Sequence, residues 1–584
     1  MGYLLFWIEA AVASVLWVAL GQALAWRVRR RWWRGWVKFV VWLLVLAPWA
    51  VIVAMFCLIE YFVVGGATEP LISAIVAGSV FLVASLALWW RGRARSTTDP
   101  QVRRAALWRL GRLAVAMAVA LVLTATTYWN LDLAVRQEMT ALRSEIGASA
   151  VALSPPAVPD AMNAAVLYQQ AIDLLSASPS PSTASAQGDA GRDWEDRVAN
   201  WLGPETGPFD PRDPQMRQFL QGSQGIIGLL REAGQRPGFN AGASYNPPTF
   251  DIPIPGLNGY KGLAKLLCLD ARVKAADGRY VEAMDDLSAS FALSAKFSSE
   301  PTLLMCLVSV SMDSLSVRTF QEILGDSTPS KESLERLAIP LDPLATALHR
   351  SFQMERLMGL SFFALPGILS GLQDDWGDGR PDADALLVLL VEGPWRVFLW
   401  RQDMASYSNH MNPMVDLAGK PYHRARDGWE QAARQLGQKP RTFGWIASCV
   451  LPSLNKAALI AAAAQASHRQ AELAKAMWLY RLDEGRFPSE LSQLVPPYLP
   501  AVPVDPFTGQ AMKLKADDDG SIIVYSFGED LDDDGGREYQ PGGKAGPGPR
   551  DGDVAFVVYR APAAAAPATG LPRTNPAAAA EAAE

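Results

Sequence analysis

ALWRLGRLAVAMAVALVLTATTYW, residues 106–129, is the stretch that decides how this chain is organised. A helix needs about 20 consecutive apolar residues to cross the roughly 30 Å hydrocarbon core of a bilayer, and this run is long enough. Three earlier runs meet the same requirement: Tyr3–Trp26, Val37–Val64 and Leu71–Trp90. The sequence therefore predicts a four-helix transmembrane anchor over residues 1–129.

The loops between these runs predict the orientation of the anchor. The second loop, Gly65–Pro70, has no Lys or Arg. The first and third loops are rich in basic residues: Arg27, Arg29, Arg30, Arg31, Arg34 and Lys38 in one, and Arg91, Arg93, Arg95, Arg103 and Arg104 in the other. Short loops of that kind stay on the cytoplasmic side. We therefore expect a multi-pass protein of the inner (cytoplasmic) membrane, with its N-terminus and everything after Trp129 extracytoplasmic.

Two features of the membrane block bear on its role. The first run is not typical of a cleaved signal peptide, because its basic residues follow the apolar stretch instead of preceding it. Glu9 and Glu60 lie within predicted spans, where ionisable groups are candidates for function. A polar path between them would make the block a small transporter, and this alternative stays open. Since no span has a charge pair at mid-depth, we interpret the block as an anchor.

Residues 130–463 predict an α-helical extracytoplasmic domain. Leu131–Ile146 continues the fourth span as a helical stalk. Apolar residues recur at helical spacing through Tyr260–Phe297, and Thr302–Leu324 returns after a turn. Further helices are predicted at residues 163–175, 215–233, 331–337, 343–363, 383–400, 424–436 and 443–485.

Signatures of catalysis are sparse in this chain. It has four histidines and no His-Glu-x-x-His pair for zinc, no Gly-x-Ser-x-Gly elbow and no phosphate-binding glycine loop. An acidic cluster lacks regular ligand spacing and is interpreted as a solvated loop: Asp374, Asp375, Asp378, Asp382 and Asp384. We assign no catalytic residue. An envelope enzyme with dispersed carboxylates in the helical domain stays open as the alternative.

The charge balance argues against a nucleic-acid partner. The net charge is -6, and the basic residues concentrate in the predicted cytoplasmic loops. Nucleic-acid-binding proteins show a basic patch, often with interleaved aromatic residues, and the extracytoplasmic part has none. We therefore expect no nucleic acid among the partners.

Residues 464–560 predict a small α+β module. A long helix through His468–Asp483 precedes two β-prone runs, Ala511–Lys515 and Ser521–Phe527, which an Asp-Gly turn joins as a hairpin. Asp553–Tyr559 supplies a third strand. The fold class is therefore mainly α, with the four-helix anchor, the α-helical domain and an α+β module that has an antiparallel sheet. Residues 561–584 are rich in Ala and Pro and predict a disordered tail.

The loop after the second of these strands is acidic. Asp530-Leu-Asp532-Asp-Asp534-Gly535 places carboxylates at alternating positions before a glycine turn. Ca²⁺ takes six to eight oxygen ligands, many of them from carboxylates. An EF-hand is excluded because Pro541 stands where its bidentate glutamate belongs. Glu538 or an Asp from residues 551–553 would complete the shell, and a solvated acidic turn is the alternative.

This module resembles the globular head of the major pseudopilin of type II secretion systems. The matching motifs are a helix exit at Tyr480…Gly485-Arg486-Phe487-Pro488, a loop at Leu494…Pro503…Asp505-Pro506, the strand Tyr525-Ser526-x-Gly528 with its acidic continuation, and a closing Asp-x-Val strand. In that family the acidic loop holds a calcium ion that orders the fold. The resemblance implies a structural calcium site here at Asp530, Asp532, Asp533, Asp534, Asp551 and Asp553.

The rest of the chain departs from that family. A pseudopilin begins with a processing site and one apolar helix, whereas here the corresponding helix is internal and carries Pro452 and Lys456. A processed, polymerising subunit is therefore not expected. We expect a non-enzymatic, membrane-anchored scaffold or interaction protein with a calcium-stabilised, pseudopilin-like module, associated with secretion or envelope assembly. Its partners would be the lipid bilayer and envelope or secretion proteins.

Overall fold

The computed structural model describes residues 100–177, 193–203, 209–250, 252–253, 256–342, 344–364, 395–397, 399–438, 454–537 and 552–561. Several expectations lie outside these residues: the first three predicted spans, Glu9, Glu60, the acidic cluster Asp374–Asp384, Glu538, Asp551 and the tail after residue 561.

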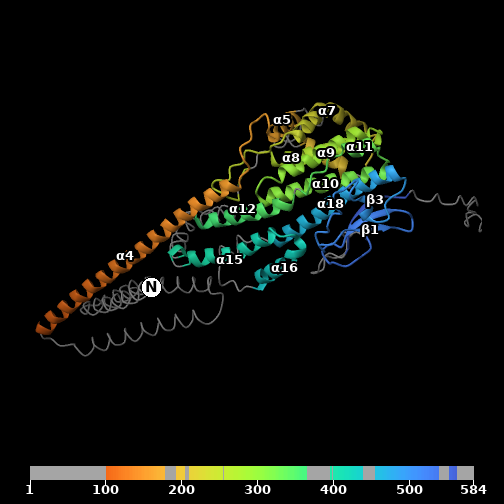
Figure 1. The fold of residues 1–584 in the computed structure, drawn as a ribbon. Helices are drawn as coiled ribbons and strands as arrows, with labels where there is room; N and C mark the ends of the chain where they lie inside the picture. The colour runs from red at the N-terminus through yellow and green to blue at the C-terminus, as the bar shows by residue number, and fades with distance from the viewer. Residues whose placement is uncertain are drawn as a thin grey trace, which may run out of the picture.

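The described residues are mainly helical, with one small antiparallel sheet (Figure 1). The helices are α4 (Pro100–Leu153), α5 (Ala164–Ala177), α6 (Asp193–Leu202), α7 (Pro214–Gln235), α8 (Leu257–Ala276), α9 (Tyr280–Phe297), α10 (Leu303–Asp326), α11 (Lys331–Arg336), α12 (Leu344–Ala364), α15 (Trp400–Ala418), α16 (Tyr422–Gln438) and α18 (Leu454–Glu484), with a 3-10 turn at Leu491–Leu494. The strands are β1 (Lys513–Ala516), β2 (Ile522–Ser526) and β3 (Val554–Tyr559). The predicted mainly α class with a small antiparallel sheet is confirmed.

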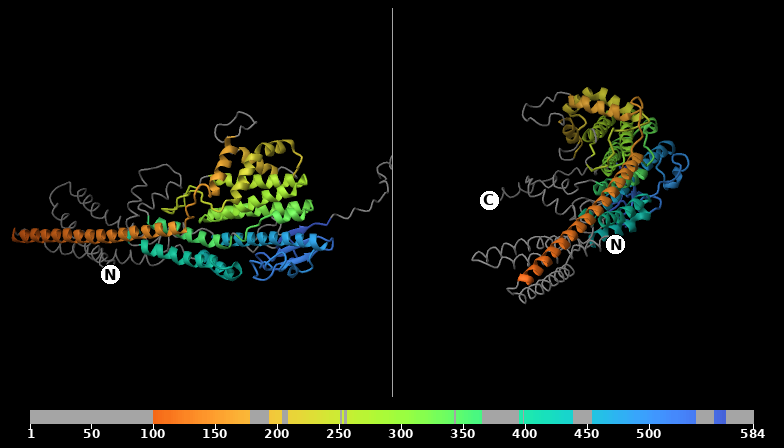
Figure 2. Two further views of the ribbon diagram at one scale, coloured as in Figure 1. Left: turned by 45° about the horizontal axis from the view of Figure 1, so that its top comes forward. Right: turned by 90° about the vertical axis from the view of Figure 1, so that its left-hand side faces the viewer.

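α4 is one continuous helix of 54 residues that projects from the rest of the described chain (Figures 1 and 2). Apolar side chains of its first half face outward: Val115 and Val122 are each 64% exposed, and Trp129 is 71% exposed. Its second half packs against the helical body, and the buried side chains are Val135, Met139, Ile146 and Ala150. The predicted stalk is therefore part of the same helix as the fourth predicted span.

Ion pairs fasten the start of α15 and the residues before it to α4. The Arg396 guanidinium lies 2.7 Å from the Asp132 carboxylate, and both side chains are largely buried. Arg401 and Glu138 make a second pair at 2.7 Å in a more exposed position. These contacts lie just beyond Trp129 along α4, so the helical body begins directly where the exposed apolar half of the helix ends.

The helical body is built around α10. α8 and α9 form the predicted hairpin, with Gly278 at φ 77° in the turn between them, and both pack on α10. Among the residues whose side chains the structure describes, which leaves out most of the first half of α4, α10 is the one helix long and apolar enough to cross a membrane. It is largely buried among other helices, as a core helix is. The four-helix anchor therefore stays a prediction, of which only the fourth run falls in the described chain.

The C-terminal module packs α18 against the three-stranded sheet (Figure 1). β2 pairs with both neighbours, and Val524 lies opposite Leu514 on one side and Phe556 on the other. Val524, Phe556 and Val558 are buried under α18 together with side chains of α9 and α10, including Phe291 and Phe320. One hydrophobic core therefore runs across residues 463 and 464, where the sequence predicts a domain boundary. The boundary itself stays a prediction.

Candidate functional site

The acidic loop follows β2 and leads back to β3. Gly528 opens it with φ at 72°, and a Cβ at this position would lie 2.8 Å from the carbonyl oxygen of Gly552. Only glycine therefore allows the two ends of the loop to approach each other so closely. Leu531 also adopts a left-handed conformation, with φ at 63°. The chain turns back sharply here and brings the start of β3 beside the loop.

Two of the aspartates accept hydrogen bonds that shape the loop. Asp530 Oδ2 accepts from the backbone N–H of Gly552 at 3.0 Å, which links the two ends of the loop. Asp533 Oδ1 accepts from the Tyr525 hydroxyl at 3.0 Å and from the backbone N–H of Gly535 at 3.1 Å. These two carboxylates therefore have structural partners within the module.

Asp534 and Asp553 differ, because each has a buried carboxylate oxygen without a hydrogen-bond partner. Asp553 is 1% exposed; its Oδ2 accepts from Gly536 N–H at 2.7 Å, while its Oδ1 has no partner. Asp534 forms an ion pair with Arg537 through Oδ1, and its Oδ2 is buried without a partner. A buried carboxylate oxygen without a donor is costly, so an ordered water or a cation would be favourable beside each of these two oxygens.

The electrostatics of Asp553 point the same way. Burial raises the pKa of Asp553 to about 6; the Gly536 hydrogen bond opposes this rise, and the neighbouring carboxylates of Asp534 and Asp533 add to it. Like charges gathered in a partly desolvated site disfavour ionisation, and a bound cation reverses that effect. The donor set is all oxygen, which suits a hard cation such as Ca²⁺.

The predicted ligands take different positions in the structure. The contacts above place four of them around the loop: Asp530, Asp533, Asp534 and Asp553. Asp532 instead is exposed, and its Oδ1 accepts from the N–H of Asp533 at 3.0 Å. Asp551 lies outside the described residues. Among the residues that the structure does describe, no group of three or more His, Cys, Asp or Glu side chains is arranged to hold a metal ion. The loop thus offers two unpartnered oxygens, and further ligands would have to come from backbone carbonyls, water or Asp551.

Sequence reasoning missed the contacts that two residues, Lys515 and Tyr525, make with this loop. Lys515 of β1 donates from Nζ to the Gly535 carbonyl at 2.8 Å and forms an ion pair with Asp517 at 2.8 Å. Tyr525 of β2 donates to Asp533. The signal was the period of two along each strand, which places alternate residues on the face that the loop covers. Lys515 offsets part of the negative charge of the loop, and Arg537 offsets another part.

Two motifs on which the pseudopilin resemblance rests lie in contact. Asp505, which is buried, accepts from the Ser526 hydroxyl at 2.7 Å and from the backbone N–H of Phe507 at 2.9 Å. Thr508 donates to its other oxygen at 3.0 Å. The Asp-Pro loop is therefore hydrogen-bonded to the end of β2, just before the acidic loop begins.

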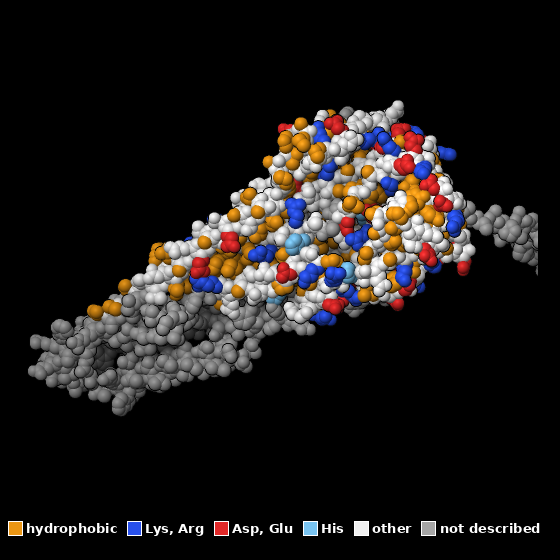
Figure 3. Space-filling model, in the orientation of Figure 1, with side chains coloured by type: hydrophobic (Ala, Val, Ile, Leu, Met, Phe, Trp, Pro, Cys, Tyr) orange, Lys and Arg blue, Asp and Glu red, His pale blue; other side chains and the backbone are white. Residues whose placement is uncertain are grey.

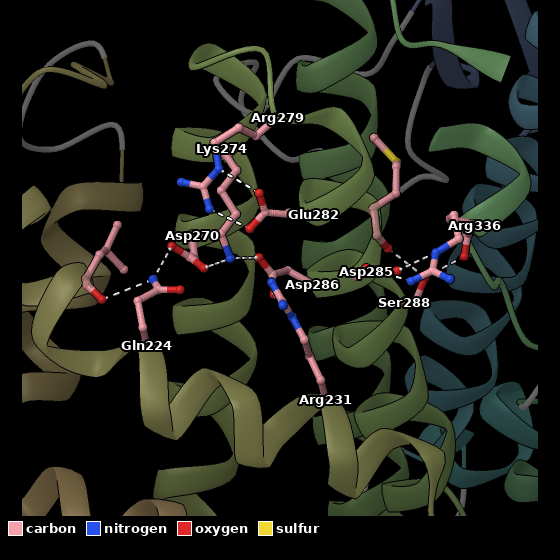
Figure 4. Close-up of polar contacts among 12 residues, drawn as sticks. Gln224, Arg231, Asp270, Lys274, Arg279, Glu282, Asp285, Asp286, Ser288 and Arg336 are labelled. Atoms are coloured by element: carbon pink, nitrogen blue, oxygen red, sulfur yellow. Dashed lines mark hydrogen bonds and ion pairs between the residues drawn. The ribbon is translucent and has the colours of Figure 1, made fainter. Parts of the chain in front are cut away.

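A buried charge network in the helical body is a second concentration of ionisable side chains among the described residues (Figure 4). Lys274 of α8 makes ion pairs with Asp270 and with Asp286, the latter at 2.7 Å, and Arg231 of α7 pairs with Asp286 at 2.6 Å. Gln224 donates to Asp270 at 3.1 Å. Burial and the Asp270 carboxylate raise the pKa of Asp286 to about 6, against the opposing effect of Arg231 and Lys274. The two basic and two acidic side chains compensate one another's charges. Their ion pairs join α7, α8 and α9.

Other carboxylates with raised pKa values lie in different places. Burial raises the pKa of Glu355 on α12 to about 7, and it raises the pKa of Glu472 on α18. Glu355 accepts from the backbone N–H of Leu303 at the start of α10. These groups contact different elements, so they do not form one carboxylate site. The acidic cluster on which the enzyme alternative relied lies outside the described residues.

His468 links the module to the helical body. Its Nδ1 lies 2.9 Å from Asp313 Oδ1 on α10, and its Nε2 lies 2.7 Å from the carbonyl oxygen of Pro340. Both partners are acceptors, so both ring nitrogens carry protons and the imidazole is charged. Burial lowers the pKa of His468, but the charge and hydrogen bond of Asp313 outweigh this effect and raise it to about 9. The side chain is therefore half of a buried ion pair.

The face of the molecule in Figure 3 shows basic and acidic side chains interspersed over the helical body.

Comparison of the chain with protein-family models, with curated proteins and with solved structures found no match. The residues and contacts described above are therefore the basis for any assignment of function.

Proposed function

We propose that this protein is a membrane-anchored, extracytoplasmic scaffold or interaction protein whose C-terminal module is stabilised by calcium. The observation that carries the proposal is α4, a single helix that joins an exposed apolar half to a half packed in the helical body. In water such an exposed row of large apolar side chains is unfavourable, and in a bilayer it is favourable.

The position of the charges along α4 supports the same arrangement. Exposed apolar side chains extend from Val115 to Trp129, and the first acidic side chain of the helix, Asp132, follows directly. Arg103, Arg104, Arg109 and Arg112 lie at the other end of the apolar stretch. Arginine on the cytoplasmic side and tryptophan at the interface are typical of a spanning helix. The helical body and module would then lie outside the cytoplasm.

Calcium binding is supported by the two buried oxygens without partners, Asp534 Oδ2 and Asp553 Oδ1. A cation between them would satisfy both and relieve the repulsion that raises the pKa of Asp553. The pseudopilin resemblance is an independent argument for the same residues. A role in secretion or envelope assembly rests on that resemblance alone, because folds are reused for unrelated functions.

Thermal unfolding of the full chain in detergent tests the calcium site. A ligand at about 100 times its Kd stabilises the native state by about 2.7 kcal/mol, so calcium should raise the midpoint by about 2–3 °C over the same sample in EGTA. Asp553→Asn should abolish this response. The control is Asp518→Asn, an exposed aspartate in the β1–β2 turn, which should keep it. An equal midpoint in calcium and in EGTA for the unaltered chain would sink the calcium proposal.

Cysteine labelling in spheroplasts of a Gram-negative host tests the orientation. Asp518→Cys should react with a membrane-impermeant maleimide in intact spheroplasts, whereas Arg104→Cys should react only after permeabilisation. The unaltered chain is the blank for its own four cysteines, of which Cys268 and Cys306 are buried. The reverse labelling pattern would overturn the proposed orientation.

A further inference from the structure

The acidic loop is connected to the helical body through β3. Asp553, a candidate ligand, immediately precedes Val554, the first residue of that strand. The carbonyl oxygen of Val554 accepts from the side-chain amide of Gln470 on α18 at 2.6 Å. Farther along β3, the carbonyl oxygen of Val558 accepts from the indole N–H of Trp478 at 2.8 Å. The beginning of β3 is therefore held by the loop on one side and by α18 on the other.

α18 in turn is bound to α10 by a buried polar contact. His468 lies two residues before Gln470 and pairs with Asp313 of α10. The ring of Phe291, from α9, lies edge-on to the imidazole with 5.9 Å between ring centroids. His468 is 1% exposed, so this contact cannot be loosened without opening the core.

β3 also contacts α10 directly. Phe556 packs against Phe320 of α10 with 6.3 Å between ring centroids, and both side chains are buried. Phe320 belongs to the same hydrophobic core as Val524 and Val558 of the sheet. Displacement of β3 would therefore expose apolar surface on α10, which links the opening of the strand to the stability of the helix.

We propose that a cation in the acidic loop stabilises α10, and with it the core of the helical body, through β3 and α18. This inference rests on the proposed calcium site and specifies what that site regulates. Without the cation, repulsion among Asp533, Asp534 and Asp553 favours opening of the loop. Opening releases the start of β3, frees Gln470 and uncovers Phe320. Coupling of this kind is reciprocal, so a ligand of the helical body that stabilises α10 would also increase the calcium affinity of the loop.

Hydrogen exchange of the full chain in detergent, followed by mass spectrometry, tests the proposal with calcium chloride and with EGTA. The informative peptides cover β3 and residues 313–326 of α10, and residues 131–150 of α4 are the reference. Calcium at about ten times its Kd should slow exchange in both β3 and α10 by about tenfold, with a smaller effect on α4. Slower exchange in both segments supports the coupling.

The outcomes separate this inference from the calcium site itself. If calcium slows exchange in β3 but not in α10, the coupling is wrong and the calcium site stands. If neither segment responds, the site is wrong and the coupling fails with it. Gln470→Leu, which leaves the loop intact, should keep the response in β3 and reduce that in α10. Should Gln470→Leu leave both responses unchanged, the path through α18 is wrong. Asp518→Asn is the control and should behave as the unaltered chain.

Discussion

At the scale of single residues, the buried charges carry the clearest energetic consequences. Lys274 compensates Asp270 and Asp286 in a site where none of the three side chains meets water. A buried cluster of compensating charges adds little net stability as a whole, but removing one of its side chains leaves the others charged and buried. Removing a side chain from a buried charge cluster should therefore cost much stability, whereas removing one from a surface ion pair should cost little.

Lys274→Met tests this difference. The substitution leaves two buried aspartates facing each other and should cost about 3–5 kcal/mol, measured as the free energy of unfolding of the full chain in detergent. Lys331→Met is the matched control, because Lys331 pairs with Asp483 in an exposed position where water screens the charge. The control should leave the unfolding midpoint nearly unchanged. Equal losses in the two variants would contradict the distinction.

The His468–Asp313 pair predicts a pH dependence. Its folded pKa of about 9 lies above the ordinary value of 6.5. The stability from the pair is therefore fully present below about pH 6.5 and is lost as the pH rises through about 9. Thermal midpoints between pH 7 and pH 10, with calcium present, should fall more steeply for the unaltered chain than for His468→Gln. His410→Gln, on α15, is the control and should retain the steep fall. Parallel curves for the unaltered chain and His468→Gln would show that the imidazole isn't charged.

At the scale of elements, the sequence predicted those helices whose apolar residues recur without interruption. The α8–α9 hairpin is one example. α15 was not predicted, because Ser, Asn and Pro at residues 408, 409, 412 and 413 are poor helix formers. Its buried side chains, Tyr407, Met411, Met414 and Ala418, still recur at helical spacing. That stripe was the available signal, and packing on α12 overrides the weak propensity.

The same limit applies to the acidic loop. Alternating aspartates predicted carboxylates around a turn, and four of the five described ones border it. The sequence did not show that Asp532 points to solvent, or that Asp553 is buried. These positions depend on the contact between Gly536 and Asp553, and on the pairing of β2 with β3, which join residues far apart in the chain.

Two glycines in helices, one in a packed position and one beside open space, predict opposite effects of substitution by alanine. A Cβ at Gly359 on α12 would lie 1.9 Å from the Tyr407 hydroxyl oxygen, so Gly359→Ala should destabilise the fold by about 1–3 kcal/mol. A Cβ at Gly225 on α7 meets nothing within 4 Å. Gly225→Ala should therefore stabilise the fold by about 0.5–1 kcal/mol through helix propensity. Chemical denaturation of both variants checks the sign, and a loss at Gly225 would contradict the open space there.

At the scale of the whole molecule, the shared core makes the module a part of the helical body. Residues of α9, α10 and α11 meet residues of α18 and the sheet in one hydrophobic cluster. The C-terminal module therefore shares its core with the helical body, although its own residues lie in one continuous stretch of sequence. Local patterns revealed the module, whereas the surface that receives it is formed by helices more than a hundred residues earlier.

Truncation after residue 453 should therefore disrupt the helical body as well. Loss of α18 and the sheet exposes Phe320 and Leu334, and the remaining chain should become sensitive to limited proteolysis within α9–α11. Truncation after Arg560 is the control and should leave the digestion pattern unchanged. A protease-resistant fragment that still contains α8–α11 in the shorter chain would show that the helical body is independent.

The continuity of α4 has a mechanical consequence. A helix of 54 residues is about 80 Å long at 1.5 Å per residue, and its second half is locked to the helical body by Arg396 and Arg401. In the proposed arrangement the helix, which has no break at Trp129, would act as a lever with one arm in the bilayer. A tilt of about 10° at one end moves the other by about 14 Å over that length. If α4 spans a bilayer as proposed, a change in bilayer thickness or lateral pressure would thus be converted into a swing of the helical body.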